Sequence, residues 1–122
     1  MAESDVVIAT TGVAGLIRPE LVREGQLVFA LSNPDPEIEP HEALKAGARF
    51  AADGKNINNV LGFPGLFRGA LDARVPEFRQ EMLVAAAETL ASHAPDDRLV
   101  PDPLDIRVHR AVTEAVHAVA RG

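Results

Sequence analysis

Hydrophobic residues in the first half of the chain form short continuous runs rather than helical stripes. The runs lie at residues 5–10, 27–31 and 49–52. Continuous apolar runs are typical of strands in a parallel sheet that is covered on both faces. The pattern therefore predicts three strands with apolar residues on both sides.

Helix signals separate these runs from one another. Residues 18–23 carry a proline in what would be a first helical turn, and residues 40–46 begin with a proline and end before Gly47. The order strand, helix, strand, helix, strand implies right-handed crossovers. We therefore predict an α/β fold in which the strands run parallel and the helices pack against them.

The second half of the chain, from residue 59 onward, has a helical pattern. One amphipathic helix is predicted from Pro76 to a turn near residues 95–97, and we expect it to pack against the sheet; its stripe contains Phe78, Met82, Leu83, Ala86 and Leu90. A last helix is predicted from about Ile106, with a stripe of Val108, Val112, Ala115, Val116 and Val119. Residues 98–103 are rich in proline, which indicates an extended connection or an added edge strand.

Size and charge narrow the class of protein. A chain of 122 residues has room for one domain, and we predict a single domain over residues 1–122. A net charge of −6 with scattered Lys and Arg argues against a nucleic-acid groove or an anionic membrane surface. The absence of cysteine excludes disulfides and thiolate chemistry.

The sequence also bears on where the protein is located. No stretch is long and apolar enough to span a bilayer, and the first five residues are acidic where a secretory signal is basic. We therefore expect a cytoplasmic protein.

Polar residues follow each predicted strand, at the edge where parallel sheets bind ligands. The three loops contain residues 10–15, 32–34 and 53–59 and should share one rim. Asn33 lies between a strand and Pro34, so its amide could face a ligand or close a local Asx turn, and spacing alone favours the turn. Asn59 and the residue before it could cap the next helix or bind a ligand, and spacing alone favours capping.

Other candidate contacts in these loops are weaker. Thr11 and Gly12 form a glycine-bearing turn that could contact a dinucleotide, but the chain lacks the full G-x-G-x-x-G pattern. Asp53 could bind a ribose, although the Asp-Gly pair that it forms with Gly54 favours a turn.

The sequence contains no convincing metal site. Asp35, Glu37 and Glu39 alternate along a proline-rich extended loop, so their side chains should diverge, and a solvated acidic loop is the better interpretation. The histidines at positions 41, 93, 109 and 117 lack metal-ligand spacing and are interpreted as partly exposed helix residues.

Residues 58–74 combine glycines with an arginine-flanked helical segment. The glycines at positions 62, 65 and 69 indicate close approach to a neighbouring backbone. Arg68 and Arg74 could pair with Asp72 or with a phosphate, and a structural ion pair is the default.

Two motifs carry a resemblance to a known family. The segments Phe29-Ala30-Leu31-Ser32-Asn33-Pro34 and residues 58–74 closely resemble the C-terminal cofactor domain of bacterial-type malic enzymes, and the likeness covers nearly the whole chain. It implies a partial, three-layer, Rossmann-like parallel sheet, the C-terminal half of the cofactor domain, followed by C-terminal helices. It further implies NAD or NADP as cofactor, malate and pyruvate as substrate and product, and a divalent metal, Mg or Mn, only in the complete enzyme.

The resemblance also assigns roles to single residues. It implies that Asn33 contacts cofactor and substrate, that Asn59 reaches the dicarboxylate substrate, and that Thr11 and Gly12 lie against the cofactor. The family's catalytic Tyr and Lys and its metal carboxylates precede the matched region, and this chain contains no Tyr. The connection before residue 58 is also shorter than the family's usual loop, by about five residues, at small entropic cost.

Two functional interpretations follow. In the first, the chain is the C-terminal cofactor-domain portion of an NAD(P)-dependent malic enzyme, which decarboxylates malate oxidatively to pyruvate and CO2, and it is inactive alone. In the second, it is a non-catalytic α/β assembly or regulatory module derived from that family. Half a sheet leaves an edge strand and apolar faces uncovered, so both interpretations predict a homo-oligomer.

Overall fold

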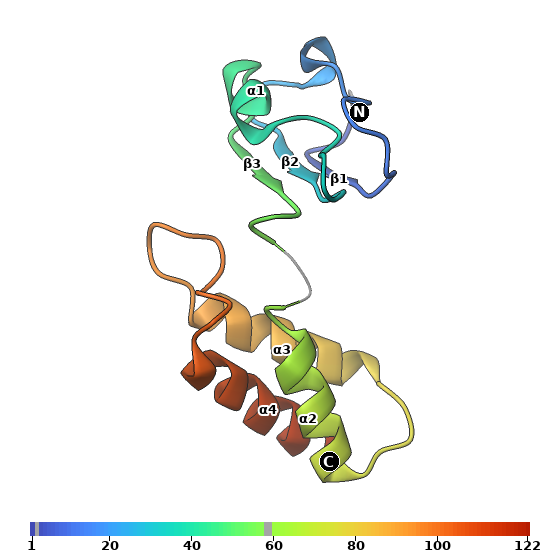
Figure 1. The fold of residues 1–122 in the computed structure, drawn as a ribbon, viewed down its shortest axis with the longest axis vertical. Helices are drawn as coiled ribbons and strands as arrows, with labels where there is room; N and C mark the ends of the chain where they lie inside the picture. The colour runs from blue at the N-terminus through green and yellow to red at the C-terminus, as the bar shows by residue number, and fades with distance from the viewer. Residues whose placement is uncertain (2, 58–59) are drawn as a thin grey trace. The chain divides into compact units, whose positions relative to one another are not determined.

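The structure is a computed structural model that describes residue 1, residues 3–57 and residues 60–122. The chain divides into two compact units, Met1–Asn58 and Asn59–Gly122. The first contains all the strands, and the second contains the three longest helices (Figure 1). Each unit has its own cluster of buried hydrophobic residues. The single domain expected from the length of the chain stays a prediction.

The first unit is built on a parallel three-stranded sheet. Its strands are β1 (Val6–Ala9), β2 (Leu27–Ala30) and β3 (Phe50–Asp53), and they lie in the order β1-β2-β3. Both neighbouring pairs are parallel. The three predicted strands and their direction are therefore confirmed, and the loops that follow them leave the same edge of the sheet.

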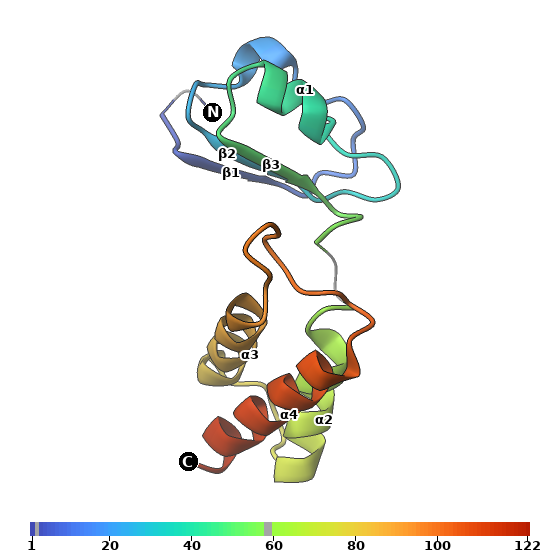
Figure 2. The same cartoon turned by 90° about the vertical axis from the view of Figure 1, so that its left-hand side faces the viewer.

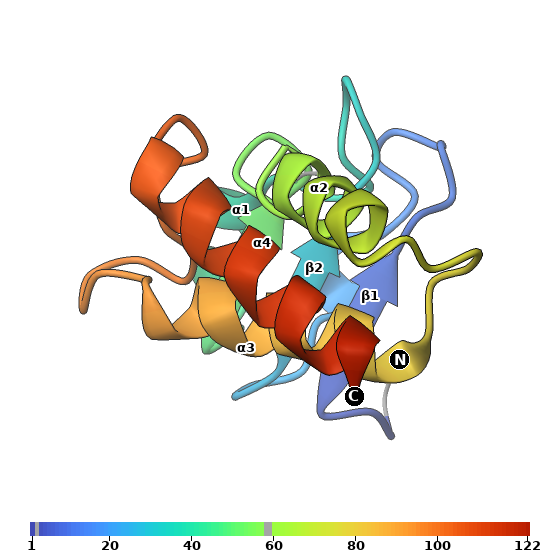
Figure 3. The ribbon, with the colours of Figure 1, turned by 90° about the horizontal axis from the view of Figure 1, so that it is seen from below.

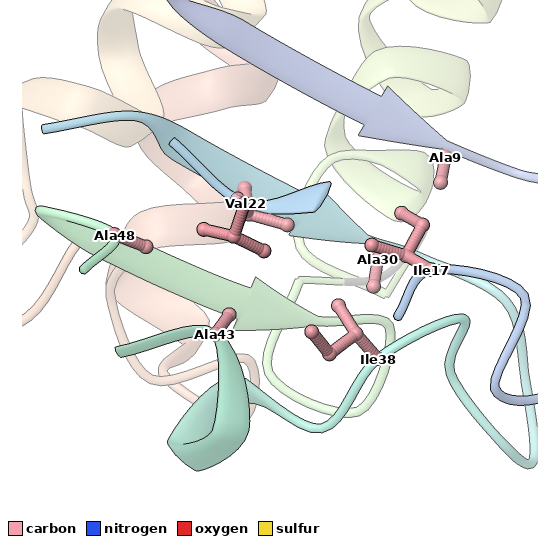
Figure 4. Close-up of a cluster of buried hydrophobic side chains, with 8 residues drawn as sticks. Ala9, Ile17, Val22, Ala30, Ile38, Ala43 and Ala48 are labelled. Atoms are coloured by element: carbon pink, nitrogen blue, oxygen red, sulfur yellow. The ribbon is translucent and has the colours of Figure 1, made fainter. Parts of the chain in front are cut away.

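One face of this sheet is covered by the segments between the strands. The helix α1 (Pro40–Lys45) and the 3-10 helix η1 (Pro19–Leu21) lie on that side (Figure 2). Side chains from the covering segments meet small side chains of the sheet region in one cluster (Figure 4), which comprises Ala9, Ile17, Val22, Val28, Ala30, Ile38, Ala43 and Ala48. The helix α1 begins at a proline and is followed by Gly47 at φ 111°, as the sequence predicts.

The short helix expected over residues 18–23 is present with its proline in the first turn, but it is only the single turn η1, because Val22 is extended and places its side chain in the core. One expectation for this unit is wrong: the sheet is not covered on both faces in β1, where Val6 is 46% exposed and Ile8 is 67% exposed. A continuous apolar run shows that both sides of a strand are apolar, but it does not show that the same chain supplies both covering layers.

The second unit is a bundle of three helices, α2 (Phe63–Ala73), α3 (Gln80–Ser92) and α4 (Ile106–Arg121). The helix α4 packs against both α2 and α3 (Figure 3). The core of the bundle contains Ala70, Met82, Ala86, Val108, Val112, Val116 and Ala120. The stripe predicted for the last helix is thus confirmed at Val108, Val112 and Val116.

The helix α3 differs from its prediction at its N-terminal end. It begins at Gln80 rather than at Pro76, so Phe78 precedes the helix and is 41% exposed. Its buried residues, Met82 and Ala86, belong to the cluster that α2 and α4 share, so its apolar face packs on these two helices; the expected packing on the sheet stays a prediction. Helical periodicity predicts which face is buried but does not name the partner.

Glycines let α2 approach α4 closely, as predicted. A Cβ atom added at Gly65 would lie 2.7 Å from the Cβ of Val112, and one at Gly69 would lie 2.7 Å from the carbonyl oxygen of Thr113. Both distances are shorter than van der Waals contact allows, so only glycine fits there.

Polar contacts at helix ends complete the bundle. Arg68 and Asp72 form the predicted i,i+4 ion pair, at 2.7 Å. Arg74 ends α2 in the left-handed conformation, at φ 55°. Asp105 caps α4 by accepting a hydrogen bond of 2.9 Å from the backbone of Arg107, and hydrogen bonds from Arg107 lower the pKa of this carboxyl to about 2.

The remaining segment of the bundle connects α3 to α4. Residues 98–103 form a loop there, so the edge strand, one of the two alternatives for this segment, is not formed. Within the described ranges, no helix is both long and apolar enough to cross a membrane.

Candidate functional site

The loops after β1 and β2 are joined along the rim of the sheet. The backbone of Gly15 donates to Pro36 over 3.1 Å, and that of Ile17 donates to the carbonyl of Glu37 over 2.9 Å. These bonds hold together residues that lie about twenty positions apart in the sequence. The prediction that the loops share one rim is confirmed.

Glu37 is the buried centre of this junction. Its side chain is 0% exposed. The oxygen Oε1 accepts hydrogen bonds from the backbone of Thr11 at 2.6 Å, from its hydroxyl at 2.8 Å, and from the hydroxyl of Ser32 at 2.6 Å. The other oxygen, Oε2, accepts from the backbone of Ser32 at 3.4 Å. One carboxylate thus connects the loop after β1 to the loop after β2.

The solvated acidic loop expected from the sequence is therefore wrong at Glu37. Asp35 and Glu39 are exposed as predicted, but the residue between them points into the rim. The alternation of an extended chain separates Glu37 from its acidic neighbours, and the donors that it meets belong to distant segments. A sequence signal was nevertheless present, because the hydroxyls of Thr11 and Ser32, each just after a strand, need an acceptor if they are buried.

The hydrogen bonds keep Glu37 ionised. Burial by itself raises the pKa of this carboxyl, but the hydrogen bonds from Ser32 and Thr11 outweigh burial and lower the pKa to about 2. Because an ionised carboxylate only accepts, the hydroxyls of Thr11 and Ser32 must both donate to it. The charge therefore fixes the orientation of both hydroxyls.

Asn33 connects the loop after β2 to the loop after β3. Its side chain is exposed, and its Nδ2 donates to the carbonyl of Gly54 over 3.3 Å. The peptide bond between Asn33 and Pro34 is cis. Within the described residues, no donor reaches its Oδ1 and no local Asx turn forms, so the turn that spacing favours is replaced by this contact between loops. Among the residues described, Oδ1 keeps its acceptor sites at the rim.

The loop after β3 is a tight turn around Asp53. Its Oδ1 accepts from the backbones of Lys55 and Asn56, each at 3.1 Å, and from the side chain of Asn56 at 2.9 Å. The turn predicted for the Asp-Gly pair is confirmed. Gly54 lies beneath Asn33, and a Cβ atom there would be 2.8 Å from Nδ2 of Asn33 and would overlap the carbonyl oxygen of Leu31.

The structure places Thr11 and Gly12 at the rim, with their backbone donors already used. The hydroxyl of Thr11 donates to Glu37 and accepts from the backbone of Val13 at 3.2 Å. The backbone of Gly12 donates to Ser32 Oγ over 2.8 Å. Gly12 has φ 72°, and a Cβ atom there would meet nothing within 4 Å. What it offers a ligand is therefore open backbone surface rather than a free N–H group.

A hollow adjoins this junction. It has a volume of about 410 Å³ and is lined by both loops, by η1 and by the start of α1; its lining includes Gly15, Arg18, Asp35, Pro36, Glu39 and Glu42. Its lining includes the carboxylates of Asp35, Glu39 and Glu42 but none of the predicted contact residues Thr11, Gly12 and Asn33. The hollow is therefore not assigned to the cofactor.

The remaining predicted groups lie elsewhere or outside the described residues. Asn58 and Asn59 fall outside them. Among the described residues, no group of three His, Asp or Glu side chains could hold a metal ion. His109 is half-buried, with Nε2 2.7 Å from the carbonyl oxygen of Pro103, and His41 and His93 are exposed.

The fold and the rim define a class of protein: a partial Rossmann-like parallel α/β unit whose polar groups gather at the carboxyl ends of its strands, followed by a helical unit. No family model matches the chain. Its sequence is 59% identical over 120 residues to NAD-dependent malic enzyme 1 of Bacillus subtilis (strain 168), an alignment that includes 98% of this chain and 27% of that protein. It is also 44% identical over 97 residues to the NADP-dependent malic enzyme of Rhizobium meliloti (strain 1021), covering 72% of this chain and 12% of the relative.

Solved structures agree with these relatives. The malic enzyme from Pyrococcus horikoshii Ot3 is 43% identical and has a TM-score of 0.84. The match covers 96% of this chain and 30% of the Pyrococcus chain. The NAD-dependent malic enzyme from Thermotoga maritima is 34% identical and has a TM-score of 0.84. The match covers 93% of this chain and 32% of the Thermotoga chain. The chain therefore corresponds to a C-terminal cofactor-domain portion of malic enzymes, and it spans less than a third of the length of each of these relatives.

The similarity also bears on the short connection before residue 58. The alignment with the Bacillus subtilis enzyme runs over 120 residues and includes 98% of this chain, so it is almost free of gaps. A connection five residues longer would not fit in such an alignment. The short loop is therefore shared with a protein named as a malic enzyme.

Proposed function

We propose that this chain supplies the part of an NAD(P)-dependent malic enzyme that presents its cofactor and substrate to each other during the oxidative decarboxylation of malate to pyruvate and CO2. The observation that carries the proposal is the exposed amide of Asn33, fixed on the carbonyl of Gly54 at the carboxyl edge of a parallel sheet. The sequence similarity to both NAD-dependent and NADP-dependent malic enzymes supports the choice of cofactor.

Each rim residue has a role in this proposal. Asn33 accepts a hydrogen bond through Oδ1 from the nicotinamide carboxamide or from the substrate hydroxyl, without placing a charge beside the carbon that loses hydride. Gly12 and Thr11 offer the surface on which the cofactor lies, because Gly12 leaves its backbone open. Asn59 is proposed to reach the dicarboxylate substrate. The bound nicotinamide supplies the hydride acceptor.

The chain is proposed to be inactive by itself. It contains no Tyr, and its described residues contain no group of three side chains that could hold the divalent ion. In this proposal, residues outside this sequence supply the ligands of the Mg or Mn ion and the groups that transfer protons. The chain's own contribution is to bind and orient.

Titration of the chain with NADH, followed by nicotinamide fluorescence, tests this proposal. We expect saturable binding that Asn33→Ala weakens about tenfold, which corresponds to roughly 1.4 kcal/mol, the size of one hydrogen bond. Glu39→Gln is the matched control, because Glu39 is an exposed residue of the same loop, and its affinity should stay within twofold of the unaltered chain.

Two results would contradict the proposal. The first is the absence of saturable binding, which would favour the assembly or regulatory module instead. The second is robust turnover when the chain alone receives malate, Mg or Mn, and either cofactor, since that would show that the proton-transfer groups are present in it.

The proposal extends to assembly and location. We place the protein in the cytoplasm and expect it to form a homo-oligomer. The support for assembly is that β1 lies at an edge of the sheet and that Ile8, on the face of β1 opposite the core, is 67% exposed.

A further inference from the structure

Glu37 is the most deeply buried charge in the first unit among the described residues. Its four hydrogen bonds all go to Thr11 and Ser32, which lie in different loops of the rim. A buried carboxylate is costly unless it is well hydrogen-bonded, so this arrangement needs a reason beyond packing. The reason lies in the neighbours of these two residues, which are Gly12 and Asn33.

We propose that Glu37 is a positioning residue of the rim: its buried carboxylate holds the loops after β1 and β2 at a fixed separation and thereby aims Gly12 and Asn33 at the ligand. The inference rests on the proposed function, and it goes beyond it by giving a role to a residue that touches neither cofactor nor substrate.

The hydrogen bonds form a continuous path from Glu37 to the open glycine. The hydroxyl of Ser32 donates to Oε1 of Glu37 at 2.6 Å and, at the same oxygen, accepts from the backbone of Gly12 at 2.8 Å. A serine hydroxyl has one donor, so its donation to Glu37 leaves its lone pairs for Gly12. The charge on Glu37 therefore decides which way Ser32 points and, through Ser32, where Gly12 lies.

The same path reaches Asn33 through the chain itself. Asn33 is the next residue after Ser32, whose backbone donates to Oε2 of Glu37 at 3.4 Å and whose hydroxyl is fixed on Oε1. On its other side, Asn33 is held by the carbonyl of Gly54. A shift of Ser32 would therefore move the amide of Asn33 relative to the loop after β3.

Glutamine at position 37 would break this arrangement with little change in shape. One carboxylate oxygen becomes an NH2 group, which donates and does not accept. At least one of the four donors from Thr11 and Ser32 then loses its acceptor. The two loops should separate or rearrange, because a buried donor without an acceptor is unfavourable.

Gln26 provides a matched control in the same unit. It is also 0% exposed, and it lies just before β2, at the opposite end of that strand from Ser32. Its Nε2 donates to the carbonyls of Met1 at 3.0 Å and Ser4 at 2.8 Å. The substitution Gln26→Leu removes buried hydrogen bonds of comparable number but leaves the rim untouched.

The test compares Glu37→Gln with Gln26→Leu in the full chain by two measurements. NADH affinity is measured by fluorescence on protein shown to be folded by urea denaturation. Amide resonances and hydrogen exchange are measured by NMR at Thr11, Gly12 and Ser32. We expect Glu37→Gln to weaken NADH binding at least fivefold and to shift these resonances with faster exchange, whereas Gln26→Leu lowers stability but changes the affinity less than twofold.

Several outcomes would overturn the inference. It is wrong if Glu37→Gln keeps both the affinity and the three amide resonances, or if both variants lose affinity in proportion to their stability, which would show a merely structural role. If the unaltered chain binds no NADH, the proposed function fails, and the positioning role is then decided by the amide resonances of Thr11, Gly12 and Ser32 alone. Unchanged resonances in Glu37→Gln would refute it, and shifted ones would support it.

A second variant keeps the test decisive if Glu37→Gln does not fold. Ser32→Ala removes the hydroxyl between Glu37 and Gly12 but leaves the carboxylate its two bonds from Thr11. We expect faster exchange of the Gly12 amide and a threefold or larger loss of NADH affinity, and Ser32→Thr, which keeps the hydroxyl, should restore both. An unchanged Gly12 amide in Ser32→Ala would overturn the inference.

Discussion

At the scale of single residues, the rim is held by groups whose partners lie in other loops. Glu37 accepts from Thr11 and Ser32, and Asn33 donates to Gly54. A glycine is as important here as the polar residues, because a side chain at Gly54 would collide with both Asn33 and Leu31. The amide of Asn33 is placed against bare backbone for that reason.

The depressed pKa of Glu37 predicts how stability depends on pH. Its pKa falls from an ordinary 4.5 to about 2 in the folded chain, so the unfolded chain binds the proton more tightly. The contribution of Glu37 to the free energy of unfolding is therefore fully present above about pH 4.5 and is lost as the pH falls toward 2. A shift of this size corresponds to at most about 3 kcal/mol.

Urea denaturation between pH 7 and pH 2.5 measures this contribution. The unaltered chain should lose more stability over that interval than Glu37→Gln, whose side chain does not titrate. Asp35→Asn serves as the control, since Asp35 is exposed in the same loop and should leave the pH dependence nearly unchanged. Equal slopes for all three proteins would contradict the assignment of a buried ionised carboxylate.

At the scale of elements, the contact of α2 with α4 shows that glycine spacing can predict close packing of a helix but not the partner that it packs against. The sequence predicts that the glycines at positions 65 and 69 are packing residues, and the structure confirms this by the short distances from a Cβ atom added there to Val112 and Thr113. The partner helix could not be predicted, because glycine spacing defines a smooth helix face but not what lies against it. The same limit applies to α3, whose stripe predicts a buried face but not the element that covers it.

Alanine substitution of two glycines, one inside α2 and one at its N-cap, tests this contact. Gly69→Ala should lower the free energy of unfolding by about 1–3 kcal/mol, since the added methyl group overlaps α4. Gly62→Ala is the control, because its new Cβ would meet only the side chain of Leu90, at an ordinary 3.6 Å. Its effect should be smaller, within about 1 kcal/mol, because Gly62 is the N-cap of α2 and meets no clash there. Urea denaturation monitored by circular dichroism gives both values, and equal losses at the two positions would refute the close packing.

At the scale of the whole molecule, the sequence predicted the strands, their order along the chain and the two long C-terminal helices, because these depend on local runs and stripes. It missed contacts that depend on tertiary structure. The burial of Glu37 requires Thr11, twenty-six positions away, to arrive beside it. The one-turn helix η1 arises because Val22 is drawn into the core, which no local propensity indicates. Local patterns therefore predict which loops form the rim, whereas long-range hydrogen bonds determine how these loops are fixed to one another.

The apolar outer face of the sheet leads to a prediction about assembly. Ile8 is 67% exposed on β1, and Phe29 and Phe50 lie on the same face with ring centroids 5.6 Å apart. Apolar surface beside an unpaired strand edge favours association, because both the surface and the edge are then removed from water. We therefore expect sedimentation velocity to show dimers or larger species whose proportion rises with protein concentration.

Lysine substitution distinguishes association through the outer face of the sheet from association through any exposed apolar residue. Ile8→Lys should shift the sedimentation profile to monomer, because a charge on that face would have to be desolvated in the assembly. Leu104→Lys is the control, since Leu104 is even more exposed, at 84%, but lies in the loop before α4. That variant should associate as the unaltered chain does. If the unaltered chain is monomeric at high concentration, the prediction of assembly is wrong. If both lysine variants dissociate alike, the outer face of the sheet does not direct assembly, and exposed apolar residues contribute to it without preference.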